Sequence, residues 1–79
     1  MTTYFEIYQR FKKGWEYCTP EYGQKKAVLV KYNIDYSNFL RAIKEPSERR
    51  LKIDWVASIC VELGISTEWV MTGRGKMLQ

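Results

Sequence analysis

The 79-residue chain contains no histidine and only two cysteines, Cys18 and Cys60. A zinc site needs several His or Cys ligands at close spacing, and the two cysteines do not form a Cys-x-x-Cys pair. A disulfide needs an oxidising compartment, and no feature of the sequence suggests secretion. We therefore expect reduced, mostly buried thiols in a cytoplasmic protein that carries no metal or other cofactor.

Long apolar segments and catalytic motifs are also missing. The longest unbroken apolar run is Ala27-Val28-Leu29-Val30, whereas a membrane-spanning helix needs about 20 such residues. No Ser or Cys has a plausible base nearby, and the sequence has neither a Gly-rich phosphate loop nor a cluster of carboxylates. We therefore expect no membrane-spanning segment, no enzymatic activity and no small-molecule substrate.

What the sequence does contain is apolar and aromatic bulk together with an excess of positive charge. A chain of this length forms one domain, residues 1–79, and buries only about 60 % of its unfolded surface. Apolar residues make up 46 % of it, including three Trp, six Tyr and three Phe, which can fill a thin core. The net charge of +4 favours an acidic partner such as nucleic acid, an acidic protein or an anionic membrane. A solvated basic surface without such a partner is the alternative.

The first segment, residues 3–18, has the periodicity of an amphipathic helix. Its apolar residues follow one another at steps of 4, 3, 4 and 3, at Tyr4, Tyr8, Phe11, Trp15 and Cys18. Thr2 or Thr3 can cap its start. Gly14 costs about 1 kcal/mol inside a helix, but Trp15 continues the apolar stripe, so we predict one continuous helix. The aromatic face is expected to be core, with a dimer surface as the alternative.

The middle of the chain predicts two short helices, residues 22–32 and 36–44, joined by a tight turn. Asn33 tolerates the left-handed conformation that ends helices. Ile34 is a lone apolar residue in the turn, and Asp35 suits the N-cap of the next helix. The apolar positions of the earlier helix are Ala27, Val28, Leu29 and Tyr32, with Val30 between them. The later helix is expected to bury Tyr36, Phe39, Leu40 and Ile43 and to expose Ser37, Asn38, Arg41 and Lys44.

Two further helices are predicted after a polar loop at residues 45–50, in which Pro46 ends the preceding helix. One spans residues 52–63, and its apolar stripe comprises Ile53, Val56, Ile59, Cys60 and Leu63. Trp55 falls off this stripe, so its exposure would mark a contact surface, such as one for self-association.

The last helix is a short one, residues 67–71. Gly64 closes the helix before it, Ser66 caps its own start and Gly73 ends it. Trp69 is expected to hold this helix against the core. The tail, residues 74–79, is expected to be loose.

Two short helices joined by a turn of about three residues form a helix-turn-helix unit. The turn needs a residue that accepts left-handed geometry and an apolar residue that fills the corner. The second helix must be apolar on one side and polar on the other, so that it can enter a major groove about 12 Å wide. Asn33 and Ile34 meet the first demand, and helix 36–44 meets the second.

The sequence resembles the DNA-binding domain of phage repressors of the CI/Cro type over residues 33–75. The closest part is Ile59-Cys60-Val61-Glu62-Leu63-Gly64-Ile65-Ser66-Thr67-Glu68-Trp69-Val70-Met71-Thr72-Gly73-Arg74-Gly75. In that family a Leu-Gly pair ends the fourth helix, Val/Ile-Ser follows, and an acidic-Trp-Leu-Leu helix leads to Thr-Gly-x-Gly. This ending is particularly similar to the phage CI repressor subgroup. The resemblance implies an all-α, compact five-helix bundle of the lambda-repressor-like helix-turn-helix type.

The chain departs from the family pattern at four places. Asn33 stands where the family usually has Gly, and Leu29 where it usually has Ala. The usual Gln at the start of the second helix falls at Lys25, with a Gln one position earlier at Gln24. A register shifted by one residue would bury Lys31 in place of Tyr32 and is rejected for that reason. The loop at residues 45–50 is longer than usual.

The resemblance implies a transcriptional regulator, typically a repressor, whose third helix reads double-stranded DNA. N-terminal residues of that helix face base edges, which nominates Tyr36, Ser37, Asn38 and Arg41 for base contacts. For phosphate contacts we nominate Gln24, Lys25, Lys26, Lys44, Arg49 and Arg50. The structural alternatives are local capping for Asn38, core packing for Tyr36 and solvation or phosphate contact for Arg41 and Lys44. For Arg49 and Arg50 the alternative is a charged loop that they keep soluble.

Operator binding by this family normally involves two-fold dimers, so we expect weak or DNA-assisted dimerisation. The rival interpretation is a helix-turn-helix fold used for protein contact, as in an antirepressor or an adaptor. The basic residues around residues 22–44 favour DNA. The carboxylates of Asp35, Glu45 and Glu48 and the aromatic first helix favour a protein partner.

Overall fold

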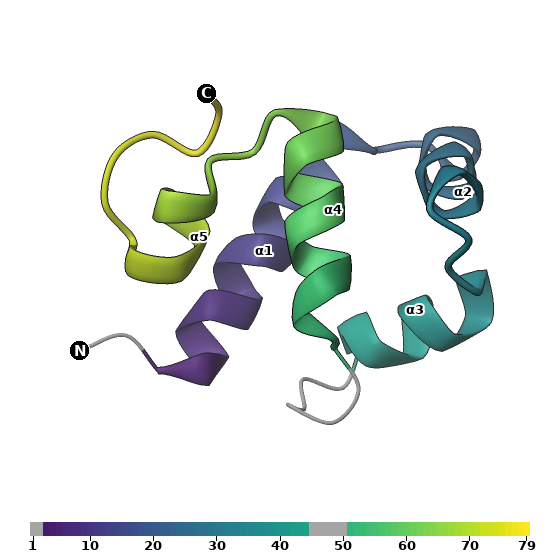
Figure 1. The fold of residues 1–79 in the computed structure, drawn as a ribbon, viewed down its shortest axis with the longest axis horizontal. Helices are drawn as coiled ribbons and strands as arrows, with labels where there is room; N and C mark the ends of the chain where they lie inside the picture. The colour runs from purple at the N-terminus through teal and green to yellow at the C-terminus, as the bar shows by residue number, and fades with distance from the viewer. Residues whose placement is uncertain (1–2, 45–50) are drawn as a thin grey trace.

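The computed structural model describes residues 3–44 and 51–79. These residues form five helices and no β-strand, in a molecule of 33 × 27 × 19 Å with a radius of gyration of 11.6 Å (Figure 1). The helices are α1 (Tyr4–Cys18), α2 (Tyr22–Lys31), α3 (Tyr36–Lys44), α4 (Ile53–Leu63) and α5 (Thr67–Thr72). The all-α, five-helix prediction is confirmed for this part of the chain, and each boundary lies within one residue of the predicted one.

Helix α1 is continuous through Gly14, as its periodicity predicted. Thr3 and Glu6 form a capping box at its start, in which the Thr3 hydroxyl accepts from the Glu6 amide and the Glu6 carboxylate accepts from the Thr3 amide. Tyr8, Phe11 and Trp15 are buried, so most of the aromatic stripe is core. Gly14 faces Ile65, and a Cβ placed on it would lie 3.1 Å from the Ile65 Cδ1 atom. The glycine therefore allows a close approach that offsets its low helix propensity.

The core is centred on Phe39 of α3, which is fully buried. Its ring meets those of Phe11 and Trp15 of α1 edge-on, at centroid distances of 6.4 and 4.9 Å. It also lies 5.9 Å from the ring of Trp55 of α4. One side chain thus joins three helices, and such aromatic pairs contribute about 0.5–1.5 kcal/mol each beyond area burial.

The turn between α2 and α3 contains the predicted left-handed residue and the predicted buried apolar residue. Asn33 has a φ of 56°, in the left-handed region, and Ile34 is buried beneath it. The Ile34 amide donates to the Leu29 carbonyl at 2.8 Å, and the Asn33 amide donates to that of Val30 at 3.0 Å. Leu29 is 1 % exposed, so the core accommodates a leucine at this position of α2.

Burial within the helices differs from the predicted stripes at several apolar positions. Val30 and Ile53 are each 66 % exposed, and Ala27 is exposed as well. Ala42 is buried instead, and Tyr36 and Leu40 are only half-buried. The buried stripe on α4 therefore comprises Val56, Ile59 and Cys60, and Ile53 instead borders an open groove beside Tyr4 and Ile7 of α1.

The C-terminal tail is held, which corrects the expectation that residues 74–79 are loose. The Ser66 amide donates to the Met77 carbonyl at 2.8 Å, and the Gln79 amide donates to the Gly64 carbonyl at 2.9 Å. An isolated antiparallel bridge pairs Ile65 with Leu78. The chain turns back after α5 (Figure 1), so the tail satisfies backbone groups that the segment between α4 and α5 leaves open.

Several further predictions about single residues are confirmed. Ser66 caps α5 by accepting from the Trp69 amide, and Gly64 and Gly73 end α4 and α5 in the left-handed conformation. Trp69 packs against the core. No helix in residues 3–44 and 51–79 has the length and apolarity needed to cross a membrane.

Both cysteines are free thiols, Cys60 buried and Cys18 half-buried. Burial raises the pKa of the Cys60 thiol to about 11, and it raises that of Cys18 as well. Since the thiolate is the reactive form, burial lowers the reactivity of both side chains near neutral pH.

Candidate nucleic-acid interface

Helix α3 has one buried and one solvent-exposed face. Phe39, Ala42 and Ile43 are buried. The opposite face exposes the predicted residues Ser37, Asn38, Arg41 and Lys44. In Figure 1, α3 lies along the lower edge of the molecule, where its outer side is not covered by another helix. Four of the nominated residues thus lie together on one accessible surface, which we call the α3 face.

The α3 face carries positive charge and hydrogen-bonding groups. Helix α3 contains no acidic residue, and its last turn contains Arg41 and Lys44. The nearest carboxylate in the sequence before it is that of Asp35, which accepts from the Asn38 amide at 2.9 Å and so caps the helix. This bond takes up the backbone of Asn38 and leaves its side-chain amide outside the cap.

The three residues nominated at the start of α2 have different environments. The Gln24 Oε1 atom accepts from the Glu21 amide at 3.0 Å, as part of a capping box. Lys25 forms an ion pair with Glu16 at 3.2 Å, and its ammonium donates to the Thr19 carbonyl and lies 5.9 Å from the Trp15 ring centroid. Lys26 is exposed.

Lys25 therefore differs from the expectation of an outward-facing phosphate ligand. Its side chain is only 12 % exposed and connects the start of α2 to the end of α1. Lysines at neighbouring positions on a helix point in different directions, and the sequence pattern alone did not reveal which of Lys25 and Lys26 faces Glu16.

A pair of tyrosines joins the first residues of α2 and α3. The rings of Tyr22 and Tyr36 lie 5.2 Å apart at an interplanar angle of 65°, an edge-on contact. The Lys26 ammonium lies 5.9 Å from the Tyr22 ring centroid. Tyr36 is therefore half-buried by Tyr22 rather than by the core alone, and Tyr22 is a residue of this region that the sequence analysis did not nominate.

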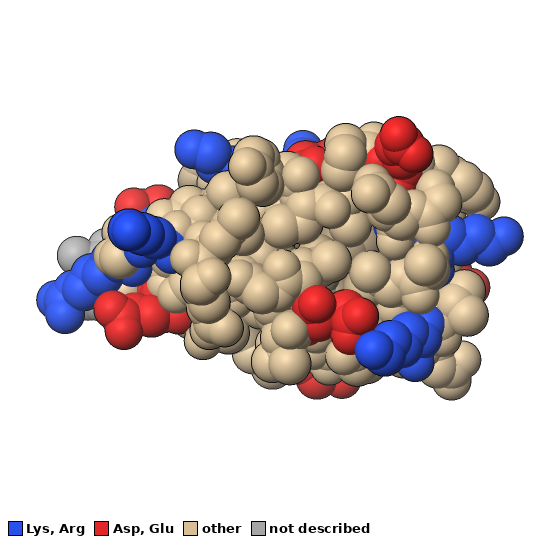
Figure 2. All heavy atoms as spheres, turned by 90° about the horizontal axis from the view of Figure 1, so that it is seen from above, with Lys and Arg blue, Asp and Glu red and all other residues tan. Residues whose placement is uncertain are grey.

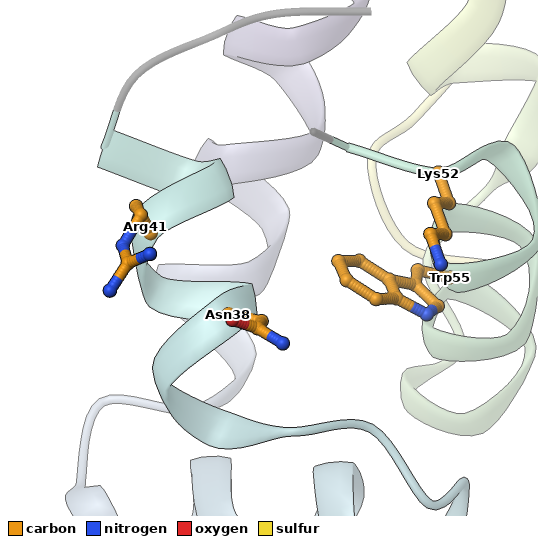
Figure 3. A pocket seen from close by; sticks show the side chains of 4 residues that line it. All are labelled: Asn38, Arg41, Lys52 and Trp55. Carbon is orange, nitrogen blue, oxygen red and sulfur yellow. The ribbon is translucent and has the colours of Figure 1, made fainter. Parts of the chain in front are cut away.

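A hollow of about 330 Å³ lies beside the α3 face, between α3 and α4. It is lined by Asn38 and Arg41 of α3, by Trp55 of α4 and by Lys52, the N-cap residue of α4. Figure 3 shows Asn38 and Trp55 pointing toward each other across it, with Lys52 beside the indole. The Lys52 ammonium lies 5.2 Å from the Trp55 ring centroid, within the range of a cation–π interaction.

Lys52 was not nominated from the sequence, and Trp55 was expected to mark a contact surface, such as one for self-association, only if it was exposed. Trp55 proves to be half-buried, because its ring packs on Phe39 while one side borders the hollow. In the sequence, the position of Trp55 off the apolar stripe of its helix was the indication that part of its ring is not in the core. The neighbouring α3 residues come from a distant part of the chain, so the hollow itself had no signature in the sequence.

The remaining nominated residues, Arg49 and Arg50, lie outside the described residues. The side of the molecule opposite α3 has a different character from the α3 face. Figure 2 shows acidic and basic side chains dispersed there around an uncharged middle. Comparisons of the chain with protein-family models, with curated proteins and with solved structures found no match.

Proposed function

We propose that this protein is a DNA-binding transcriptional regulator of the lambda-repressor-like helix-turn-helix type, with α3 as the helix that enters the major groove. The observation that carries the proposal is the α3 face: an exposed, polar and cationic surface without a carboxylate of its own, on a helix anchored by Phe39 and a left-handed corner. An α-helix fits the major groove, where each base pair presents a distinct pattern of donors and acceptors.

The exposed residues suit different parts of a duplex. The Arg41 guanidinium can donate two hydrogen bonds to a guanine, and the Asn38 amide can pair with an adenine; a good pair of this kind discriminates by about 1–3 kcal/mol. Ser37 and the partly exposed Tyr36 supply hydroxyl groups at the start of the helix. Lys26 and Lys44 supply charges for phosphates on either side of the groove.

One copy of such a unit reads half of an operator. Two-fold dimers of helix-turn-helix proteins place their recognition helices about 34–36 Å apart, one turn of B-DNA. We propose weak or DNA-assisted dimerisation of this chain, which would give repression or activation by occupying a promoter.

The test begins with duplexes selected from a random-sequence library and measured by fluorescence anisotropy over a series of salt concentrations. The Arg41→Ala substitution is expected to weaken binding of the selected duplex by about 5- to 150-fold, which corresponds to about 1–3 kcal/mol. It should also relax the sequence preference at one base pair. Arg74→Ala, an exposed arginine of the C-terminal segment, is the matched control and is expected to bind as the wild type does.

Either of two results would contradict the proposal. One is the absence of duplex binding at low salt, where phosphate contacts are strongest. The other is equal affinity of the Arg41→Ala and Arg74→Ala proteins for every selected duplex.

A second candidate function is protein contact through the same fold. The observation that favours it is the exposure of apolar side chains away from α3, including Phe5 at 58 %, Tyr17 at 65 % and Val61 at 76 %. A protein of this second kind would bind no duplex even at low salt. Substitution of these apolar residues, and not of Arg41, would then abolish binding to the protein partner.

A further inference from the structure

The hollow between α3 and α4 combines three chemical features in a small space. Lys52 brings a positive charge beside the indole, Asn38 brings an amide, and Trp55 brings a flat apolar wall. Arg41 lines the hollow from α3, with its guanidinium directed away from the indole (Figure 3). Its volume of about 330 Å³ is at the small end of the range of about 300–1,000 Å³ that is typical of small-molecule pockets. The feature therefore suits a compact group that is anionic on one side and apolar on the other.

The charges at the hollow have no acidic partner within residues 3–44 and 51–79. The ion pairs found there join Lys25 to Glu16 and Lys31 to Glu62, and neither involves Lys52 or Arg41. The Lys52 ammonium instead lies over the Trp55 ring, an arrangement in which it can exchange a ring contact for an anion without breaking an ion pair.

Position identifies the occupant that fits. Arg41 and Asn38 line the hollow and also belong to the α3 face, so a duplex held by α3 would bring its backbone to this side of the helix. A sugar–phosphate unit has the required chemistry, because its phosphate is anionic and its deoxyribose is largely apolar. Half to two-thirds of protein–DNA hydrogen bonds go to phosphate and sugar.

We propose that the hollow receives one sugar–phosphate unit of the DNA strand beside α3, with the phosphate on Lys52 and the deoxyribose against Trp55. This inference rests on the proposed function and extends it to α4, since it assigns Lys52 and Trp55 to the DNA interface. Trp55 then positions the backbone relative to α3, because its ring packs on Phe39 of that helix at a centroid distance of 5.9 Å.

The salt dependence of binding tests the role of Lys52. Each phosphate contact contributes about −0.9 to the slope of log K against log salt concentration. Lys52→Met retains the stem of the side chain and removes its charge, and it is expected to reduce the magnitude of the slope by about 1. Lys76→Met makes the same change in charge on an exposed residue of the C-terminal segment and should leave the slope unchanged.

Tryptophan emission tests the role of Trp55 by a separate signal. Trp15 is fully buried and Trp69 lies on α5, so Trp55 is the indole that borders the hollow. Saturation with the selected duplex is expected to quench the wild-type emission. Trp55→Phe should lose most of this change and weaken binding only a few-fold, with circular dichroism confirming that the variant is folded.

The outcomes separate this inference from the proposed function. If no duplex binds the wild type, both fail. If the duplex binds with sensitivity to Arg41→Ala, but Lys52→Met keeps the wild-type slope and the emission does not change, only the role of the hollow is overturned. Quenching of Trp55 by a mononucleotide such as dTMP, with no response to the duplex, would also overturn it in favour of a small-ligand site.

Discussion

At the scale of single residues, the position of α3 depends on Asn33. This residue has a φ of 56°, and its own amide and that of Ile34 donate back into α2, to the carbonyls of Val30 and Leu29. An L-residue in the left-handed region carries a cost of about 1–2 kcal/mol, which asparagine partly avoids and glycine avoids entirely. The turn that sets the angle between α2 and α3 therefore costs conformational free energy at one residue, Asn33.

Substitutions at Asn33 should separate this cost from side-chain contacts. We predict that Asn33→Ala lowers the free energy of unfolding by about 1 kcal/mol and that Asn33→Gly equals or exceeds the wild type. Urea unfolding followed by circular dichroism at 222 nm measures both. Equal stability of the alanine and glycine variants would show that the backbone conformation is not the source of the cost.

At the scale of elements, Glu62 connects α4 to the end of α2. Its Oε1 atom accepts from the Lys31 ammonium at 2.8 Å and from the Tyr32 hydroxyl at 3.0 Å. These two hydrogen bonds, led by that of Lys31, lower the pKa of the Glu62 carboxyl below its ordinary value of 4.5. The contact lies at the end of α2 that is next to the corner, so it steadies the α2–α3 pair against the rest of the molecule.

The sign of this pKa change gives a pH dependence. A carboxyl whose pKa is lower in the folded state contributes stability above its ordinary pKa of 4.5, and this contribution is lost as the pH falls through the lowered value. We predict that Glu62→Gln slightly lowers the melting temperature at pH 7 and that the difference from the wild type shrinks by pH 3. The effect is small because the carboxylate is partly solvated.

A double variant supplies the control for Glu62. In a Lys31→Met/Tyr32→Phe background the carboxylate has lost both donors, so Glu62→Gln should then have little effect at any pH. A difference between wild type and Glu62→Gln that is the same at pH 3 and pH 7 would contradict the assignment of these two donors.

At the scale of the whole molecule, the C-terminal tail joins the segment between α4 and α5. The Ser66 and Gln79 amides donate to the Met77 and Gly64 carbonyls, and Ile65 pairs with Leu78. Ile65 also packs against Gly14 of α1. The C-terminal tail and α1 thus both contact the segment between α4 and α5, on the side of the molecule away from α3 (Figure 1).

Removal of residues 76–79 is therefore expected to destabilise the protein and not its α3 face. Loss of two backbone hydrogen bonds corresponds to about 1–3 kcal/mol, and in a domain of this size about 1 kcal/mol lowers the melting temperature by about 4–8 °C. Thermal unfolding measures the loss, with Lys76→Ala in the full chain as control. A truncated protein that melts within a degree of the full chain would show that the tail contributes nothing.

The sequence by itself determined the five helices and their ends. Capping residues such as Thr3, Asp35 and Ser66 act on amides three positions away, and left-handed residues such as Asn33 and Gly64 act at one position. These interactions are local, so a reading of neighbouring residues was sufficient to predict them. The exposure of Ser37, Asn38, Arg41 and Lys44 followed in the same way from the periodicity of α3.

Only the tertiary structure decided which members of similar patterns face inward and what lies beside α3. It buried Ala42 and exposed Ile53, turned Lys25 toward Glu16, paired the tail with residues 64–66, and brought Lys52 and Trp55 next to Asn38 and Arg41. These contacts join segments that are distant along the chain. Their geometry depends on how whole helices pack against one another, which the spacing of residues within a single helix does not contain.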